Sequence, residues 1–443
     1  MNLQLIVPLL YPGAWLAFAL SLKRPEVGVY YLTLILPLQT LRYRLQGYPL
    51  GGQIVDLVLL GMLIGLWRNG RLEFSTFSMR GILMLATVYS YLSLWWGSYF
   101  FGYGMPISLA DPRFAMWREW AEFGVICALT FAAITTVKQI ETVLFLMSMT
   151  AFLLSWDFFQ TMSLRDVSHF SWELRYSGVL GYANANGFAA FEAMFILLLF
   201  GLIGSGLSTR LKLLIGPSAI ACGYGLLFAF SRGAYIGFAC GMIVLGALRR
   251  RFFSVLVLAA VAGCFLLPSA VSDRIGATYE EGTTTTEKTL DNSTMERMAL
   301  WQIAIDVIKA HPLLGTGFNT FASMHPLGFK DTHNLYLKVL LEQGAVGFVI
   351  FLLMLWKMIS QGYDLFRYST DPFLASLGLG LTVTIVGAVV MNVFGDRWSY
   401  LQVDGYLWIL LALVCRGRLV SSEPQTQFAN EAAVPLHPAP AQA

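Results

Sequence analysis

The feature that most constrains this chain is a series of apolar runs, most of them close to the length that crosses a lipid bilayer. A spanning helix needs about 20 predominantly apolar residues, and lipid cannot hydrogen-bond free backbone groups, so the chain within the bilayer must be helical. Of its 443 residues, 57% are hydrophobic and 12% are charged. The charged share is about half that of an average soluble domain. We therefore expect an all-α polytopic membrane protein with about 12 transmembrane helices.

Thirteen runs are candidate spans, of which the second, the third and the last are short, and twelve or thirteen true crossings are expected. The candidates are residues 3–20, 26–41, 54–67, 81–97, 121–137, 140–159, 187–204, 213–230, 233–248, 252–268, 343–359, 374–394 and 403–415.

Lys and Arg in short loops mark the cytoplasmic side of a membrane protein. The run "RRR" at 249–251 is the strongest such signal, and "TRLK", "KMISQGYDLFR" and "CRGR" fall on the same side if every intervening run crosses. The chain then divides into four parts: spans in 1–268, one large periplasmic loop at 269–342, C-terminal spans in 343–418 and a disordered cytoplasmic tail at 419–443. Residues 98–120, 160–186 and 231–232 join the large loop on the outer side.

The large loop is predicted to contain amphipathic helices. Its first part, "YEEGTTTTEKTLDNS", is rich in threonine and is expected to be mobile. Ser293 and Glu296 then have the spacing of a capping box, and Pro312 ends the amphipathic segment that follows. A second helix is expected to begin at His333, in "KDTHNLYLKVLLEQGAVG".

Arginines on the outer side are the first candidates for a functional site, because charge near a membrane span is costly. Four of them stand out: Arg175, Arg232, Arg297 and Arg397. Arg232 lies between two apolar runs with almost no loop, so it needs an anion or a carboxylate from another segment. Arg397, beside Trp398 and Asp396, is better explained by snorkelling at the membrane edge.

Several arginines from separate segments on one face predict a site for a multiply charged oxyanion such as pyrophosphate. Forked guanidinium donors match phosphate oxygens, and helix N-termini also favour anions. The sequence has no Asp-x-Asp, P-loop, Gly-x-Ser-x-Gly or His-Glu-x-x-His motif. We therefore expect no cofactor, no metal and no nucleic-acid partner, and a reaction in which arginines supply the charge stabilisation.

Among the five histidines, His333 has the strongest context for chemistry. It opens a helix, and Asp331 two residues earlier could orient the imidazole and raise its basicity. Such a histidine is a common general base for taking a proton from a hydroxyl. A role in helix capping or in phosphate binding remains an alternative.

These segments together resemble a known family. The stretch "HNLYLKVLLEQGAVG" fits the pattern His, then Asn, Ser or Gln, nine residues, Gly, two residues, Gly. The segments "SRGAYIG", "RMALW", "HPLLGTGFNTF" and "GYANANGFAAF" are also similar to segments of the O-antigen ligase and polymerase superfamily of bacterial inner membranes, over roughly residues 170 to 400. The ligases often have Leu where this chain has Ile236. The motif positions are His333, Asn334, Gly344, Gly347, Arg232, Arg297 and Trp301.

The resemblance implies transfer of a polysaccharide from undecaprenyl pyrophosphate to a hydroxyl of lipid A-core, on the periplasmic face of a Gram-negative inner membrane. It implies that Arg232 and Arg297 bind the departing pyrophosphate and that His333 activates the acceptor hydroxyl. Arg175 is added from its charge and position, and Asn334 and Asp331 are expected to support the histidine.

Three other functions stay open at this point. An O-antigen polymerase would use a second carrier-linked glycan as acceptor, and a protein O-oligosaccharyltransferase would use a Ser or Thr of a protein. A transporter would need polar residues at mid-span and broken helices in matching halves. Charge at mid-span is sparse here, with Glu192 as the main exception, so transport fits poorly.

Overall fold

The structure is a computed structural model of the 443-residue chain. The residues that it describes are 3–108, 110–182, 184–203, 206–250, 252–253, 267–276, 279–281, 288–290, 292–324 and 331–432.

Nearly all the regular structure in these residues is helical. The elements of the first half are α1 Leu3–Ser21, α2 Glu26–Ile35, α3 Gln39–Leu45, η1 Gly51–Gln53, α4 Ile54–Arg68, α5 Arg80–Phe100, α6 Pro112–Ala133, α7 Val137–Met162, η2 Trp172–Leu174, α8 Ala185–Leu202, α9 Thr209–Phe228 and α10 Arg232–Leu248. The second half has α12 Ser269–Gly276, β1 Tyr279–Glu281, β2 Lys288–Leu290, α13 Asn292–Ala310, η3 Phe321–Met324, α14 Leu335–Tyr368, α15 Pro372–Met391 and α16 Leu401–Ala432.

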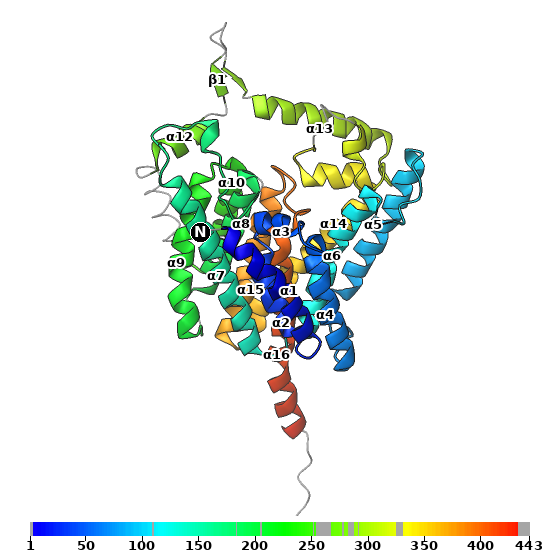
Figure 1. The fold of residues 1–443 in the computed structure, drawn as a ribbon, viewed down its shortest axis with the longest axis vertical. Coiled ribbons are helices and arrows are strands. Elements are labelled where there is room, and N and C mark those ends of the chain that lie inside the picture. Colours follow the sequence, from blue (N-terminus) through cyan, green and yellow to red (C-terminus); the bar gives the residue numbers. More distant parts are fainter. Residues whose placement is uncertain are drawn as a thin grey trace, which may run out of the picture.

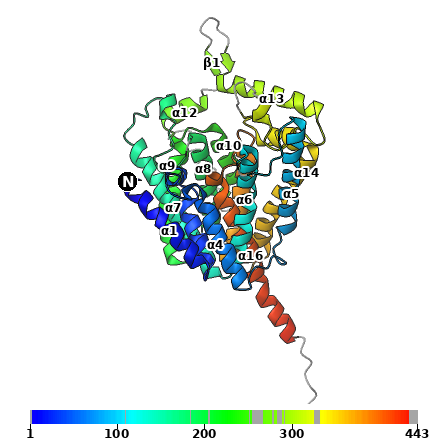
Figure 2. The same cartoon turned by 45° about the vertical axis from the view of Figure 1, so that its right-hand side comes forward.

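The long helices form a bundle that α12 and α13 cover at one end, while α16 extends beyond the other end (Figures 1 and 2). Helix α15 packs against α8, α10, α14 and α16, and most side chains of α8 and α15 are buried. A helix that is apolar all round belongs in the interior. These two helices are therefore central to the bundle.

The helices support a polytopic membrane protein. Six segments of the described chain are long and apolar enough to cross a membrane: Gly51–Arg68, Val137–Met162, Ala185–Leu202, Thr209–Phe228, Leu335–Tyr368 and Pro372–Met391. Shorter apolar helices are Val7–Ser21, Glu26–Ile35 and Arg232–Leu248. The number of crossings, twelve or thirteen, stays a prediction.

Most candidate spans from the sequence coincide with helices, with three differences. The run 26–41 is not one helix: α2 ends at Ile35 and α3 begins at Gln39, because Pro37 lies between them. The run 252–268 lies largely outside the described residues. Helix α16 continues to Ala432, so the tail expected to be disordered from 419 is helical in its first part.

The large loop contains the expected helix α13, which begins at Asn292 and ends at Ala310 before Pro312. The Ser293 side chain of the expected capping box lies outside the described residues. The threonine run at 283–286, which was expected to be mobile, lies outside the described residues. On either side of it, β1 and β2 pair antiparallel with Tyr279 opposite Leu290. These two short strands are a small departure from an all-α fold.

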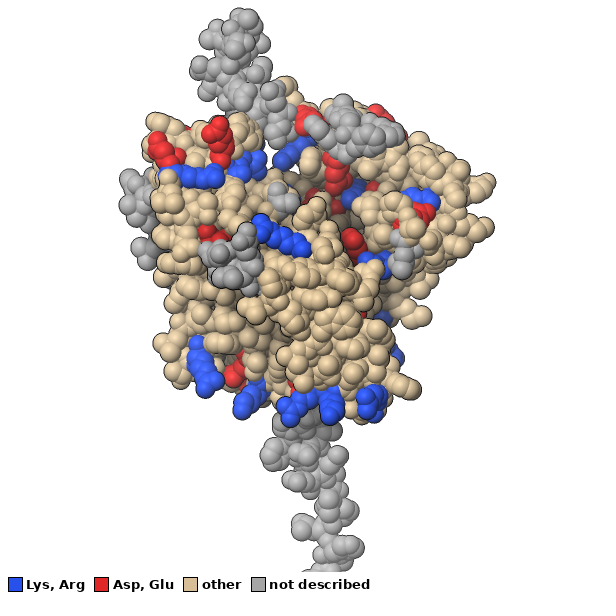
Figure 3. Space-filling view, viewed as in Figure 1, with Lys and Arg blue, Asp and Glu red and all other residues tan. Residues whose placement is uncertain are grey.

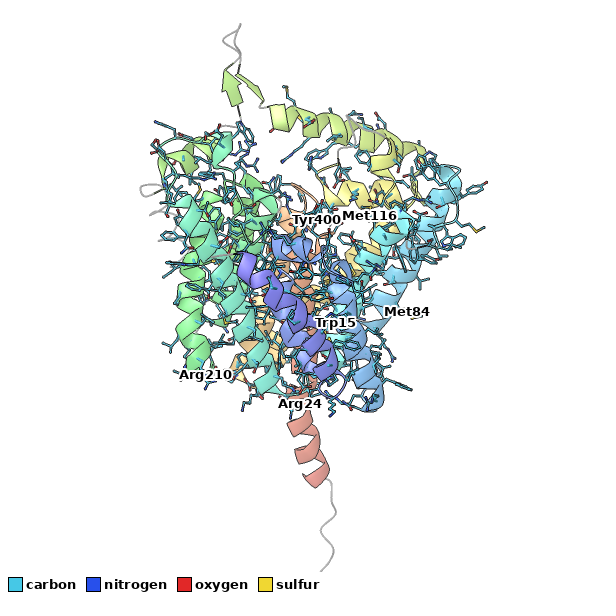
Figure 4. The ribbon with its side chains drawn as sticks, in the orientation of Figure 1. Trp15, Arg24, Met84, Met116, Arg210 and Tyr400 are labelled. Carbon is cyan, nitrogen blue, oxygen red and sulfur yellow. The ribbon has the colours of Figure 1, made fainter. Side chains whose placement is uncertain are left out.

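A row of exposed positive charge marks the end of the molecule opposite α13. Lys and Arg side chains form a row along that end (Figure 3), and Arg24 and Arg210 are placed there (Figure 4). Such a row is typical of a cytoplasmic face. The asymmetry agrees with the expected orientation of the "TRLK" turn.

Gly344 forms the kink that lets α14 change direction between its amphipathic start and its long apolar part. Its backbone has φ 64° and ψ −171° inside an otherwise helical segment, a conformation that is essentially restricted to glycine. A Cβ added there would lie 2.2 Å from the Leu313 carbonyl oxygen. The glycine is therefore structural.

Replacing Gly344 with alanine is expected to destabilise the protein strongly. The backbone strain alone costs about 1–3 kcal/mol, and the contact with the Leu313 carbonyl adds to it. The thermal unfolding midpoint in detergent should fall clearly for Gly344→Ala. The matched control is Gly223→Ala in α9, where an added Cβ meets nothing within 4 Å. Equal midpoints for the two variants would contradict this account.

Candidate active site

Five arginines from five segments line one cavity at the end of the bundle covered by α12 and α13. We call it the arginine cavity. Its arginines are Arg175, Arg232, Arg274, Arg297 and Arg397, and its other lining residues are Asn186, Ala190, Ser231, Gly233, Ala234, Met391 and Phe394. No Asp or Glu is among these lining residues. The described part of the wall therefore concentrates positive charge.

Each arginine reaches the cavity from a different part of the fold. Arg175 follows η2, Arg232 is the first residue of α10, and Arg297 lies on α13. The first residues of α10 also line the cavity. A helix N-terminus favours an anion, although the Ala234 N–H already donates to the Ser231 carbonyl at 3.1 Å.

Mutual repulsion acts on these cations. Burial lowers the pKa of Arg175, and the charges of Arg297 and Arg232 lower it further. The Arg175 Nη2 atom donates to Asn186 Oδ1 at 2.6 Å, while its buried Nε has no hydrogen-bond partner among the described residues. A bound anion would relieve both the repulsion and the missing bond.

The arginine cavity is small in this structure, at about 30 Å³. That volume admits a water-sized group, so the cavity in this conformation is too small for a phosphate. Arginine side chains have many rotamers, so the size of the cavity depends on their conformations.

Arg397 does not have the membrane-edge role that the sequence favoured. Its side chain lines the arginine cavity. Burial lowers the pKa of Arg397, and the charges of Arg297 and Arg175 lower it further, while Asp396 and Tyr400 raise it. The neighbouring Asp396 pairs with Lys338 at 2.9 Å. The snorkelling interpretation is therefore wrong, because the guanidinium turns inward.

Arg274 is the site residue that the sequence reasoning missed. It is buried, and its Nε donates to the Phe230 carbonyl at 3.4 Å. Its guanidinium lies 4.8 Å from the Trp172 ring centroid, and that of Arg175 lies 5.4 Å from the same ring. Cation–π contact with one tryptophan thus orients two arginines. The charge argument used for the other arginines could have found Arg274, which also lies on the expected outer side.

His333 lies just before α14 and close enough to the arginine cavity for its charges to act on the imidazole. The residue is half-buried, and its φ of 52° puts it in the left-handed region, where non-glycine residues are uncommon and often functional. Burial lowers the pKa of His333, and the Arg297 charge lowers it further. The neutral, proton-accepting form is therefore favoured at neutral pH.

The charge of Asp331 raises the pKa of His333, as the sequence analysis expected, but burial and the charge of Arg297 lower that pKa by more. No hydrogen bond within the described part of the chain joins the two side chains. Asp331 Oδ1 accepts from the Thr332 backbone N–H at 2.8 Å, and Oδ2 lies 3.7 Å from Lys338 Nζ. Asp331 thus shapes the loop.

Asn334 caps α14, which removes helix capping from the possible roles of His333. The Asn334 side chain accepts from the N–H groups of Tyr336 and Leu337 at 3.0 and 3.2 Å. Trp301 of the Arg-x-x-x-Trp segment donates from Nε1 to the Thr332 carbonyl at 2.9 Å. The tryptophan thereby ties the helix of Arg297 to the loop of His333.

Lys338 and Asp396 form a buried ion pair that joins α14 to the segment carrying Arg397. Their side chains are 17% and 2% exposed, with Nζ and Oδ2 2.9 Å apart. Asp396 Oδ2 also accepts from Ser399 Oγ at 2.7 Å. The pair therefore fixes the spacing between the His333 loop and Arg397.

Removing the lysine is expected to destabilise the protein by about 3–5 kcal/mol, because Lys338→Met leaves Asp396 buried without its counter-charge. The double variant Lys338→Met/Asp396→Asn should recover most of the loss. The control is Lys309→Met. The Lys309 side chain is 71% exposed, and an ion pair at such an exposed position contributes little to stability. Unfolding in nanodiscs would measure all three variants. If Lys338→Met were as stable as Lys309→Met, the ion pair would have no role in holding the two segments together.

The structure thus defines a polytopic helical membrane protein with an arginine-lined cavity and a nearby histidine at one end. Residues 217–352, which include Arg232, Arg297 and His333, match the family model for O-antigen ligase. A protein of Rickettsia felis named "Putative polysaccharide ligase" is 24% identical over 210 residues, which are 43% of this chain and 48% of that protein. A protein of the same name from Rickettsia bellii is 26% identical over 212 residues, with the same shares.

The chain therefore spans about half the length of the relatives that it matches. The family model and the relatives together support this chain as a member of the O-antigen ligase family.

Proposed function

We propose that this chain is an inner-membrane glycosyltransferase that transfers O-antigen polysaccharide from undecaprenyl pyrophosphate to lipid A-core on the periplasmic face. The observation that carries the proposal is the convergence of five arginines on one cavity, with no Asp or Glu among its described lining residues. A pyrophosphate leaving group needs such fixed positive charge as its own negative charge develops. Arg232, Arg297 and Arg175 hold it, with Arg274 and Arg397 added from the structure.

His333 acts as general base toward the acceptor hydroxyl. It takes the hydroxyl proton while the oxygen forms a bond to the anomeric carbon of the donor sugar. The bond from that carbon to the pyrophosphate oxygen breaks, and its electron pair leaves with the pyrophosphate. A single displacement of this kind inverts the configuration at the anomeric carbon. The arginines supply the charge stabilisation, so the reaction is metal-independent in this proposal.

The periplasmic assignment of the site is supported by charge asymmetry. The row of Lys and Arg at the opposite end of the molecule (Figure 3) fits a cytoplasmic face. The arginine cavity lies at the end carrying α12 and α13, through Arg274 and Arg297.

Deletion of the gene in its Gram-negative host tests the proposal. The expected result is lipopolysaccharide with core but without O-antigen, together with long polymer still attached to its carrier. Loss of the long polymer itself would identify an O-antigen polymerase. Loss of glycan from a secreted protein, with normal lipopolysaccharide, would identify a protein O-oligosaccharyltransferase. Transfer that depends strictly on a divalent ion would overturn the role given to the arginines.

A further inference from the structure

A second cavity, of about 320 Å³, lies between α3, η1, α4, α6 and the start of α16. Its volume falls in the range of small-molecule sites. Charged side chains of both signs line it: Arg42, Arg118, Asp56, Glu119 and Glu122. With two positive and three negative groups, this wall does not suit a pyrophosphate. We call it the polar cavity.

Several polar atoms in this wall have hydrogen-bonding capacity to spare. Arg118 Nη1 donates to Asp56 Oδ2 at 3.1 Å, and Arg42 Nη2 donates to Gln402 Oε1 at 3.3 Å. The Nε atoms of both arginines and Oε1 of Glu122 are buried and have no hydrogen-bond partner among the described residues. Buried polar atoms normally find partners. The two arginine Nε donors and the Glu122 acceptor are therefore available to a ligand. Hydroxyl groups suit them, because a hydroxyl can both accept and donate a hydrogen bond.

Aromatic side chains complete the lining. Tyr43 and Tyr400 line the polar cavity and are exposed, and Tyr400 lies toward the end carrying α13 (Figure 4). A tyrosine presents a flat apolar face beside a polar tip. The C–H face of a sugar ring can lie on such a face while its hydroxyls meet the charged groups.

The polar cavity adjoins the arginine cavity through the segment between α15 and α16. Arg397 lines the arginine cavity, and Ser399 lines the polar cavity. Two residues of extended chain span at most about 7 Å. A sugar in the polar cavity is therefore separated by one short segment from an anion held by the arginines.

A third cavity, of about 90 Å³, borders the polar cavity. It shares Glu119 and Ser399 with the polar cavity and is also lined by Ile350, Phe351 and Met354. These three residues lie on α14, one of the membrane-spanning candidates. The third cavity therefore places apolar side chains beside the polar cavity.

We propose that the polar cavity binds the uncharged sugar headgroup of the acceptor glycolipid, with Glu122, Arg42 and Arg118 as hydrogen-bonding partners of its hydroxyls. This inference rests on the proposed function, because it assigns the acceptor side of the same transfer. Glu119 lines both the polar cavity and the third cavity. Its carboxylate disfavours the donor, because the donor has a negatively charged pyrophosphate between its sugar and its lipid.

Binding of soluble probes to the full-length protein in nanodiscs tests this assignment without requiring transfer. The probes are core oligosaccharide released from its lipid, O-polysaccharide released from its carrier, and inorganic pyrophosphate. Two variants change the polar cavity: Glu122→Gln removes the carboxylate, and Gly52→Phe adds bulk where a Cβ meets only Gln46 Cγ at 3.6 Å. The control Gly216→Phe adds the same bulk in α9, where a Cβ meets nothing within 4 Å.

The core oligosaccharide is expected to bind the wild type and the control, and to lose at least about tenfold in affinity in both cavity variants, as a lost or blocked set of hydrogen bonds implies. Pyrophosphate binding should stay unchanged in all of them, which also shows that they are folded. No core binding to the wild type, or equal binding to the wild type and both cavity variants, would overturn the assignment. If only the O-polysaccharide bound, and its binding were weakened in the cavity variants, the polar cavity would be a site for the donor glycan. That result would also overturn the assignment to the acceptor. The deletion phenotype separately decides the proposed function.

Discussion

Replacing Arg297 with alanine should reduce transfer by about 10²–10³-fold, the usual cost of removing one donor that stabilises developing negative charge. Arg297 is central because its charge acts on Arg175, on Arg397 and on His333. Arg297→Lys should recover part of the rate, since it restores the charge without the forked geometry. Steady-state transfer from a lipid-linked donor by the reconstituted protein would measure these effects.

The same variant should change the pH dependence of the reaction. Arg297 lowers the pKa of His333, so its removal should raise that pKa and move the acid limb of the rate profile to higher pH. The control is Lys309→Ala on the same helix, whose side chain is 71% exposed and whose loss should leave rate and profile unchanged. An Arg297→Ala enzyme with a normal rate would remove this arginine from the mechanism.

Much of the fold could be predicted from the sequence, because spanning helices have a simple signature. Apolar runs of sufficient length located most of the helices to within a few residues, as in α4, α7 and α9. Apolar runs and helices differ where a local feature interrupts a run: Pro37 separates α2 from α3 within one apolar stretch. The sequence also did not predict that α16 extends to Ala432. A segment rich in Pro, Ala and Gln is typical of disorder, and its composition does not mark where a preceding helix ends.

The candidate site could be predicted in part for a different reason. Arg175, Arg232 and Arg297 were selected by charge near spans, and the structure brings them to one cavity. For Arg397, the neighbouring Trp398 and Asp396 favour a position at the membrane edge when only the sequence is considered. The sequence cannot show that Lys338, 58 positions away, takes that carboxylate at 2.9 Å.

The polar cavity has no local signature at all. Arg42, Asp56 and Glu122 lie on different elements and are far apart in the chain. Each alone reads as a charge at a helix end or at the edge of an apolar run. Only the packing of α3, α4 and α6 brings them together, which is why a substrate site of this kind follows from the fold and not from motifs.

His333 should be the residue whose removal has the largest effect on transfer. Loss of a general base costs about 10²–10⁴-fold, so variants without the imidazole should have little activity. The φ of 52° at this position complicates a simple alanine test, because alanine is strained in the left-handed region. His333→Gly and His333→Asn adopt that conformation readily. Both should remain folded and bind pyrophosphate normally while losing transfer.

The wild-type rate should also report the state of the imidazole. Because the pKa of His333 is lowered by burial and by Arg297, the neutral form persists to lower pH than for an ordinary histidine. The rate should therefore fall with acidification only below about pH 6.5, the usual histidine value. This limb should be absent from the residual activity of His333→Asn and His333→Gly. If either variant transferred at the wild-type rate, the histidine would have only a conformational role, since both keep the backbone and neither can take the proton.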